Sequence, residues 1–163
     1  MSNKCPQCGA EYAADEDCCN RFNLCLAKEY EASSAYAAVH HLTVICYMLQ
    51  HNAYSHKVWL EAREMLRQFI RQGITPVEVR KRTRNKLDSK RRKWSITKGA
   101  RFSKFDGVAW TRTIADVRQE NPEIYCADVR LWSRRVLADT EPVVQELKIS
   151  SPASSKSRRG SGR

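Results

Sequence analysis

Residues 39–51, VHHLTVICYMLQH, decide how we expect the chain to fold. The stretch is apolar enough to be a core helix, yet it carries three of the four histidines of the chain. Its residues recur at helical spacing in two stripes: Leu42, Ile45, Cys46 and Leu49 form one, and His40, Val44, Tyr47 and His51 form the other. A helix that is apolar on most sides has neighbours around it. We therefore predict a central helix over about 35–50, ended by Asn52.

The flanking sequence predicts further helices. Apolar residues recur at helical spacing over about 18–31, 55–72 and 122–138. Gly73 is a suitable C-cap for the second of these. Thr75-Pro76-Val77-Glu78 has the pattern of a capping box with proline at the first helical position, and starts a short helix that runs to about residue 84.

The C-terminal part is predicted to hold a short helix over about 113–118 and then the last long helix. Asn121 before Pro122 is the N-cap of that helix, and Glu141-Pro142 ends it. Residues 143–149 form either a short strand or a loosely docked segment. The predicted fold is mainly α: a small bundle of about five helices in one domain, residues 1–149, with a disordered basic tail at 150–163.

Cysteines near the start of the chain indicate a metal site. Cys5-Pro6-Gln7-Cys8-Gly9 is a C-x-x-C knuckle followed by glycine, an arrangement in which two thiolates reach one zinc ion. The first residues lack the apolar stretch of a signal peptide, so we expect a cytosolic protein. In that reducing compartment the seven cysteines are thiols or metal ligands rather than disulfides. We predict a zinc knuckle that folds back onto the central helix.

The remaining metal ligands are less sharply defined by the sequence. Cys18 and Cys25 stand two helical turns apart, roughly 10 Å, so they do not share a metal. His40 and His51 are roughly 16 Å apart along their helix, so at most one of them joins a given ion. An antiparallel return of the central helix would bring Cys18 toward His51. The choice between the two histidines stays open at this point, and His41 remains a third candidate.

Several of these residues carry a resemblance to a known family. The motifs are the CPxCG knuckle and, further along, Cys18 with Phe22, the pair Glu29-Tyr30, Val39-His40-x-Leu42-Thr43-Val44, Tyr47, Gln50-His51, Thr113-x-x-Asp116-Val117 and Val129-x-x-Trp132. With them the chain resembles, over most of residues 5–137, a bacterial family of small uncharacterised proteins, a domain of unknown function.

The resemblance implies Cys5, Cys8, Cys18 and one or both of His40 and His51 as the functional cluster, and it implies no known reaction. The family usually has Asp after Thr-Val and Pro after Gln-His, where this chain has Ile45 and Asn52. If that Asp is catalytic in relatives, this protein lacks the activity.

Positive charge is concentrated in one segment. The chain has a net charge of +11, and residues 80–104 hold twelve Lys and Arg side chains against one acidic residue, Asp88. Lys and Arg neutralise phosphates, and interleaved aromatic side chains stack on exposed bases. The predicted nucleic-acid-binding residues are Arg80, Lys81, Arg82, Arg84, Lys90, Arg91, Arg92, Lys93, Trp94, Lys98 and Arg101. The alternative is a solvated loop that only keeps the protein soluble.

These observations lead to three hypotheses of function. The first is a zinc-stabilised helical module that binds nucleic acid, DNA or RNA, or a nucleoprotein complex without sequence specificity. The second is a zinc-dependent metalloenzyme, with Glu29 as the nearest candidate for a general base. The third is an adaptor subunit that binds another protein, for example one with an acidic face. A membrane partner is not expected, because the chain has no run of 18 apolar residues and the basic segment has no amphipathic stripe.

Overall fold

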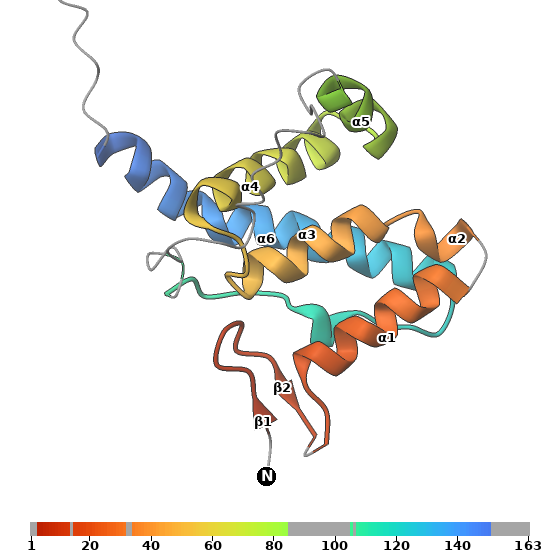
Figure 1. Cartoon of the computed structure of the whole chain (residues 1–163). Helices are drawn as coiled ribbons and strands as arrows, with labels where there is room; N and C mark the ends of the chain where they lie inside the picture. The colour runs from red at the N-terminus through yellow and green to blue at the C-terminus, as the bar shows by residue number, and fades with distance from the viewer. Residues whose placement is uncertain (1–2, 14, 32–33, 85–104, 106, 151–163) are drawn as a thin grey trace, which may run out of the picture.

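The computed structural model of the chain describes residues 3–13, 15–31, 34–84, 105 and 107–150. A short hairpin comes first, with strands β1 (Asn3–Lys4) and β2 (Glu11–Tyr12). Helices make up most of the rest (Figure 1): α1 (Cys18–Glu31), α2 (Ser34–Ala37), α3 (His40–Gln50), α4 (His56–Arg71), α5 (Pro76–Arg84), the 3₁₀ turn η3 (Ile114–Asp116) and α6 (Pro122–Ser150). The mainly helical fold with an N-terminal cysteine cluster is as predicted.

Helix α3 lies at the centre of the bundle, in contact with α1, α4 and α6. Its residue Leu49 is fully buried, and the indole N–H of Trp59 in α4 donates to the Leu49 carbonyl at 3.2 Å. The indole of Trp132 in α6 donates to the Gln50 side chain at 2.9 Å. The Gln50 amide in turn donates to the Arg112 carbonyl at 2.7 Å. The apolar character of residues 39–51 thus reflects contacts with neighbouring helices on several sides.

The predicted continuous helix over 35–50 is wrong in one respect, because the chain breaks between α2 and α3. Val39 leaves helical geometry with φ −114° and ψ 6°, and its carbonyl accepts the first hydrogen bonds of α3. The break lets α2 pack on α6, where the ring of Tyr36 lies 5.3 Å from that of Tyr125 and the Cys126 thiol donates to the Ala35 carbonyl. Tertiary packing overrides a helical propensity that favours one straight rod.

The predicted end of the last helix at Pro142 is also wrong, and so is the alternative of a strand over 143–149, because α6 runs through the proline to Ser150. A proline inside a helix costs about 3 kcal/mol. The turn before it is held by the buried Arg63 of α4, which donates to Thr140 Oγ1 at 2.8 Å and to the Glu141 carboxylate at 2.6 Å. Beyond the proline, Val144 is buried. These contacts offset the cost of continuing the helix.

The predicted caps are confirmed. The Glu78 carboxylate accepts from the Thr75 N–H and the Thr75 hydroxyl accepts from the Glu78 N–H, which makes the capping box of α5. Asn121 Oδ1 accepts from the Ile124 N–H at the start of α6. Gly73 follows α4 with φ +64°, a left-handed conformation that favours glycine. The short helix predicted over 113–118 is only the 3₁₀ turn η3.

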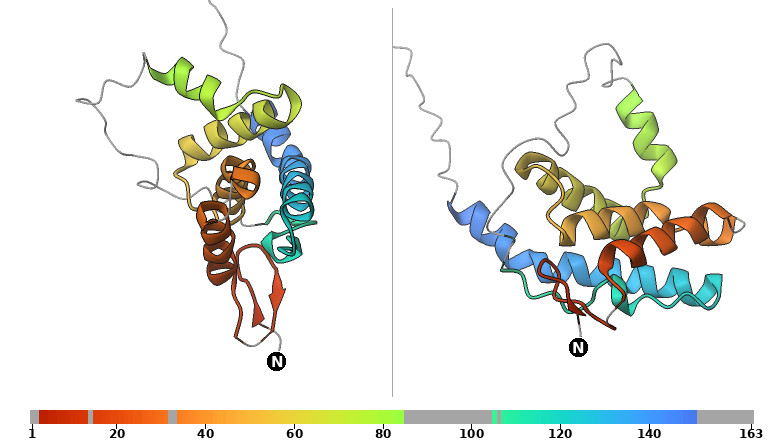
Figure 2. Two further views of the ribbon diagram at one scale, coloured as in Figure 1. Left: turned by 90° about the vertical axis from the view of Figure 1, so that its right-hand side faces the viewer. Right: turned by 60° about the horizontal axis from the view of Figure 1, so that its bottom comes forward.

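The hairpin and α5 project from opposite sides of the bundle, as two views at right angles agree (Figures 1 and 2). Figure 2 also shows α6 running along the length of the bundle. Among the described helices, we find none with the length and apolar character that a bilayer crossing requires. Residues 85–104 of the predicted basic segment (80–104) and residues 151–163 of the predicted tail (150–163) lie outside the described residues.

The continuation of α6 through its proline generates a prediction. Replacing the exposed Pro142 with Ala restores the N–H that can bond to the carbonyl four residues earlier. We expect Pro142→Ala to raise the free energy of unfolding by about 1–3 kcal/mol, measured by urea denaturation. Pro122→Ala is the matched control, because Pro122 begins α6 and needs no intrahelical donor there. A Pro142→Ala variant no more stable than Pro122→Ala would contradict the continuous helix.

Candidate metal centre

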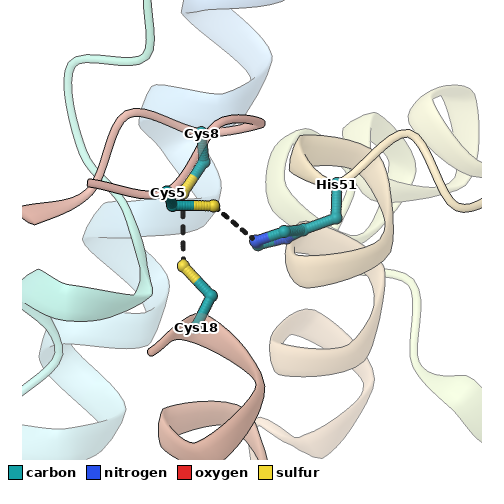
Figure 3. Close-up of side chains that lie close together, drawn as sticks. All are labelled: Cys5, Cys8, Cys18 and His51. Carbon is teal, nitrogen blue, oxygen red and sulfur yellow. Dashed lines mark hydrogen bonds between the residues drawn. The ribbon is translucent and has the colours of Figure 1, made fainter. Parts of the chain in front are cut away.

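The hairpin shapes a turn that presents two thiols on one side. The strands pair antiparallel with Asn3 opposite Tyr12. The Cys5 N–H donates to the Ala10 carbonyl at 2.8 Å, and the Gly9 N–H donates to the Cys5 carbonyl at 2.9 Å. Gly9 has φ +74°, which explains why glycine follows the second cysteine. This closed turn aims the Cys5 and Cys8 side chains at one point (Figure 3).

The third thiol comes from the first residue of α1. The Asp17 carboxylate caps this helix by accepting from the Asn20 N–H at 2.7 Å. Cys18 is therefore held at the first turn of the helix, where its side chain can face the hairpin. Its sulfur also contacts the Tyr12 hydroxyl of β2 at 3.1 Å. The same thiol thus connects the hairpin to the bundle.

The fourth side chain is His51, directly after α3. The ligand atoms of Cys5, Cys8, Cys18 and His51 all lie within 4.8 Å of one another. Cys5 Sγ is 3.8 Å from His51 Nε2, and Cys8 Sγ is 3.4 Å from Cys18 Sγ. In a tetrahedral thiolate–imidazole site the ligand atoms stand about 3.5–3.8 Å apart. Figure 3 shows the four side chains converging from the hairpin, α1 and the end of α3, so they can hold one metal ion.

The orientation of His51 is set by its second nitrogen. Nδ1 lies 2.8 Å from the Tyr47 carbonyl, and because a carbonyl can only accept, Nδ1 carries the proton. Nε2 is then left with the lone pair that a metal requires. The imidazole stacks on the Tyr47 ring at 4.1 Å, and that ring stacks on Phe22 of α1 at 3.9 Å. Gln7 of the knuckle donates to the His51 carbonyl at 3.2 Å.

The electrostatics of the cluster favour protons or a cation. The hydrogen bond with Cys8, together with burial, raises the pKa of Cys18 to about 12, although His51 and Tyr12 oppose the shift. Burial and the neighbouring thiols also raise the pKa of Tyr12. Three thiolates in such a space repel one another unless a positive charge lies between them. A bound metal ion supplies that positive charge, so that its thiol ligands lose their protons and bind as thiolates.

Comparison with known proteins identifies the family of the chain but no function. The model of a family of unknown function, DUF5946, matches residues 3–141. The chain belongs to this family. No curated protein and no solved structure shows significant similarity to it. The matched region of the DUF5946 chain includes the hairpin, Cys18 and His51, and most of α6.

The structure places His40 of the DUF5946 chain away from the metal cluster. Its Nδ1 is 2.6 Å from the Glu29 carboxylate, whose other oxygen accepts from the hydroxyls of Thr43 and Tyr125 at 2.6 Å each. Glu29 is buried, and three partners satisfy it. Of the two histidines left open by the sequence, His51 is therefore the one beside the thiols, and Glu29, once a candidate general base, is engaged far along α1. His41 lies against Phe69 of α4.

Some residues of the site were not anticipated. The sequence indicates Tyr47 as a helical stripe residue and as part of the family motifs, but not as the acceptor and stacking partner of His51, although an i, i+4 spacing allows both. Tyr12 and Gln7 gave no signal in the sequence. The structure describes all seven cysteines as free thiols: Cys19 is exposed, and Cys25, Cys46 and Cys126 are buried away from the cluster.

The predicted nucleic-acid-binding residues are only partly described. Arg80, Lys81 and Arg82 are exposed on α5, and Arg84 is its last residue. The others, namely Lys90, Arg91, Arg92, Lys93, Trp94, Lys98 and Arg101, lie outside the described residues.

The two histidine environments generate a prediction on metal affinity. His51→Ala removes one of four ligands, so zinc affinity should fall by about 100-fold or more, beyond what losing an outer partner of a ligand costs. His40→Ala is the matched control in the same helix; it removes a partner of Glu29 and should leave zinc affinity unchanged. Competition with a chromophoric chelator measures both. Equal losses in the two variants would contradict the assignment.

Proposed function

We propose that this protein is a zinc-stabilised helical binding module, with Zn²⁺ held by Cys5, Cys8, Cys18 and His51. The observation that carries the proposal is the convergence of the four ligand atoms within 4.8 Å of one another. Thiolate and imidazole donors in a tetrahedral set are typical of structural zinc. The fixed tautomer of His51 adds a second reason, because its metal-facing nitrogen needs no rearrangement.

The donor set favours a structural over a catalytic role. A catalytic zinc keeps one position for water or substrate, with three protein ligands. Here four side chains would fill a tetrahedron around the ion, and three of them, Cys8, Cys18 and His51, are buried. The ion would tie the hairpin to the start of α1 and the end of α3. A pair of two-residue strands is at best marginally stable alone, so this tie positions the N-terminus.

The proposed partner is nucleic acid, bound without sequence specificity. The support is the charge distribution: the net charge is +11, and twelve of the 29 Lys and Arg residues fall between residues 80 and 104. The described beginning of this segment, with Arg80, Lys81 and Arg82 exposed, lies on α5, which projects from the side of the bundle opposite the hairpin (Figure 1). Binding there would leave the metal centre free to act as scaffold.

Removal of zinc should lower thermal stability. With free zinc about 1,000-fold above the dissociation constant, binding contributes about 4 kcal/mol, which corresponds to about 10 °C in Tm for a domain of this size. We expect a chelator to lower the Tm of the wild type by that amount and to have no effect on Cys18→Ser, which starts low. Cys19→Ser, the adjacent exposed thiol, should behave like the wild type. A chelator-independent Tm for the wild type would remove the zinc proposal.

Nucleic-acid binding should depend on the basic segment and on salt. Changing Arg91, Arg92 and Lys93 to Ala should weaken binding to single- and double-stranded oligonucleotides and reduce the slope of log K against log salt by about 3 if each cation contacts a phosphate. Fluorescence anisotropy between about 50 and 200 mM salt measures this.

The matched control removes the same charge from helical surfaces, by changing the exposed Lys57, Arg71 and Arg135 to Ala. It should affect binding much less than the segment variant does. Absence of binding to DNA and RNA even at low salt would refute the nucleic-acid proposal, and so would an equal loss in both variants. Neither result bears on the zinc site.

A further inference from the structure

A cavity lies away from the metal centre, beside the opposite end of α3. It has a volume of about 380 Å³ and lies between the start of α3, the end of α4 with the turn that follows it, and α6. That volume is in the range of sites for small organic ligands. His41, which lines it, is roughly 15 Å from His51 along the helix. The cavity and the metal cluster are therefore separate sites.

The charged groups lining the cavity are all basic. Arg130 and Arg134 stand one turn apart on α6, and His41 faces them from α3; no Asp or Glu is among the described lining residues. Four other arginines of the bundle pair with carboxylates: Arg63 with Glu141, Arg112 and Arg118 with Asp128, and Arg67 with Glu64. In the described part of the chain, Arg130 and Arg134 form no such ion pair.

Two neighbouring polar groups do not offset the positive charge of the cavity wall. The Ser133 hydroxyl donates to the Arg130 carbonyl, so it offers no proton to the cavity. The Glu78 carboxylate is turned onto Thr75 in the capping box of α5. Arg130 and Arg134 are both exposed and stand one helical turn apart, so an anion that bridges them would form charge-assisted hydrogen bonds with both.

One part of the cavity wall is apolar, while Thr75 and Ser133 add polar groups beside the arginines. Leu42, Phe69, Ile70 and Ile74 line it, and the Phe69 ring meets His41 edge to face at 4.6 Å. A bare inorganic anion would contact none of this apolar surface. A ligand with an anionic head and an apolar body would use both parts of the cavity.

We infer that this cavity binds a small organic anion, whose phosphate or carboxylate head bridges Arg130 and Arg134 while its apolar body packs against Phe69 and Ile70. The site differs from the basic segment proposed to bind nucleic acid, because its described lining residues come from α3 and the two residues before it, α4, the turn that follows α4, the start of α5 and α6. It is also independent of zinc.

His41 provides a local reporter of binding. Burial lowers its pKa, with further lowering by His40 and Arg130, while Glu29 of α1 acts in the opposite direction. An anion seated between the two arginines adds negative charge beside the imidazole, so the pKa of His41 should rise on binding. The NMR signals of this ring distinguish the cavity from phosphate contacts elsewhere on the chain.

The test uses the full zinc-loaded chain and three probes: phenyl phosphate, benzoate and inorganic phosphate. We expect saturable binding of phenyl phosphate by calorimetry in the micromolar to millimolar range, with a rise in the His41 pKa. Benzoate tests a carboxylate head on the same apolar body, and inorganic phosphate tests the head alone, which should bind more weakly.

Two variants locate the binding site. Arg130→Gln with Arg134→Gln should weaken phenyl phosphate binding by about tenfold or more, as expected for lost hydrogen bonds to charged groups. Arg135→Gln is the matched control, an exposed arginine of α6 that does not line the cavity, and should bind as the wild type does. Tighter binding of benzoate than of phenyl phosphate would assign a carboxylate ligand. No saturable binding of either organic probe, an unmoved His41 signal, or equal losses in both variants would overturn the inference.

Discussion

The contact between the N-terminal thiols and His51 is the constraint on which the arrangement of the molecule depends. The hairpin has only two residues in each strand, and such a pair is marginal in water. Structural zinc contributes about 10 kcal/mol or more of binding free energy in small peptides. A metal ion bound by Cys5, Cys8, Cys18 and His51 would tie the hairpin and the first turn of α1 to the end of α3. The antiparallel course of α1 and α3 brings Cys18 and His51 together for this contact.

Helix α3 is mostly apolar and lies in the core, yet it carries several polar side chains with separate roles. His51 at its C-terminal end faces the thiols, and His40 at its N-terminal end reaches the buried Glu29. His41 lines the basic cavity, and Gln50 bonds to Trp132 and to the chain before η3. A buried polar group without a partner costs about 1–3 kcal/mol. His40, Gln50 and His51 each have a polar partner on another element, so these residues of α3 help to specify which elements lie beside it.

Much of this arrangement could be predicted from the sequence, where local signals are strong. The knuckle, the caps of α5 and α6 and the central helix depend on short-range patterns. The break at Val39 and the continuation of α6 through Pro142 could not be predicted from the sequence. Packing of α2 on α6 and the contacts of Arg63 override the local preferences of these residues. The choice of His51 over His40 needed the relative course of two helices, and the carboxylate partner of His40 needed α1 and α6 in place. The basic cavity unites three separated segments and had no signal along the chain.

The central claim is that one zinc ion is bound by three sulfurs and one imidazole nitrogen. X-ray absorption at the zinc edge on the purified, zinc-loaded protein tests it most directly. The account predicts three sulfur neighbours at about 2.3 Å and one nitrogen at about 2.0–2.1 Å, with no further oxygen. A shell dominated by oxygen and nitrogen, a water in place of one ligand, or a chain that retains no zinc would contradict it.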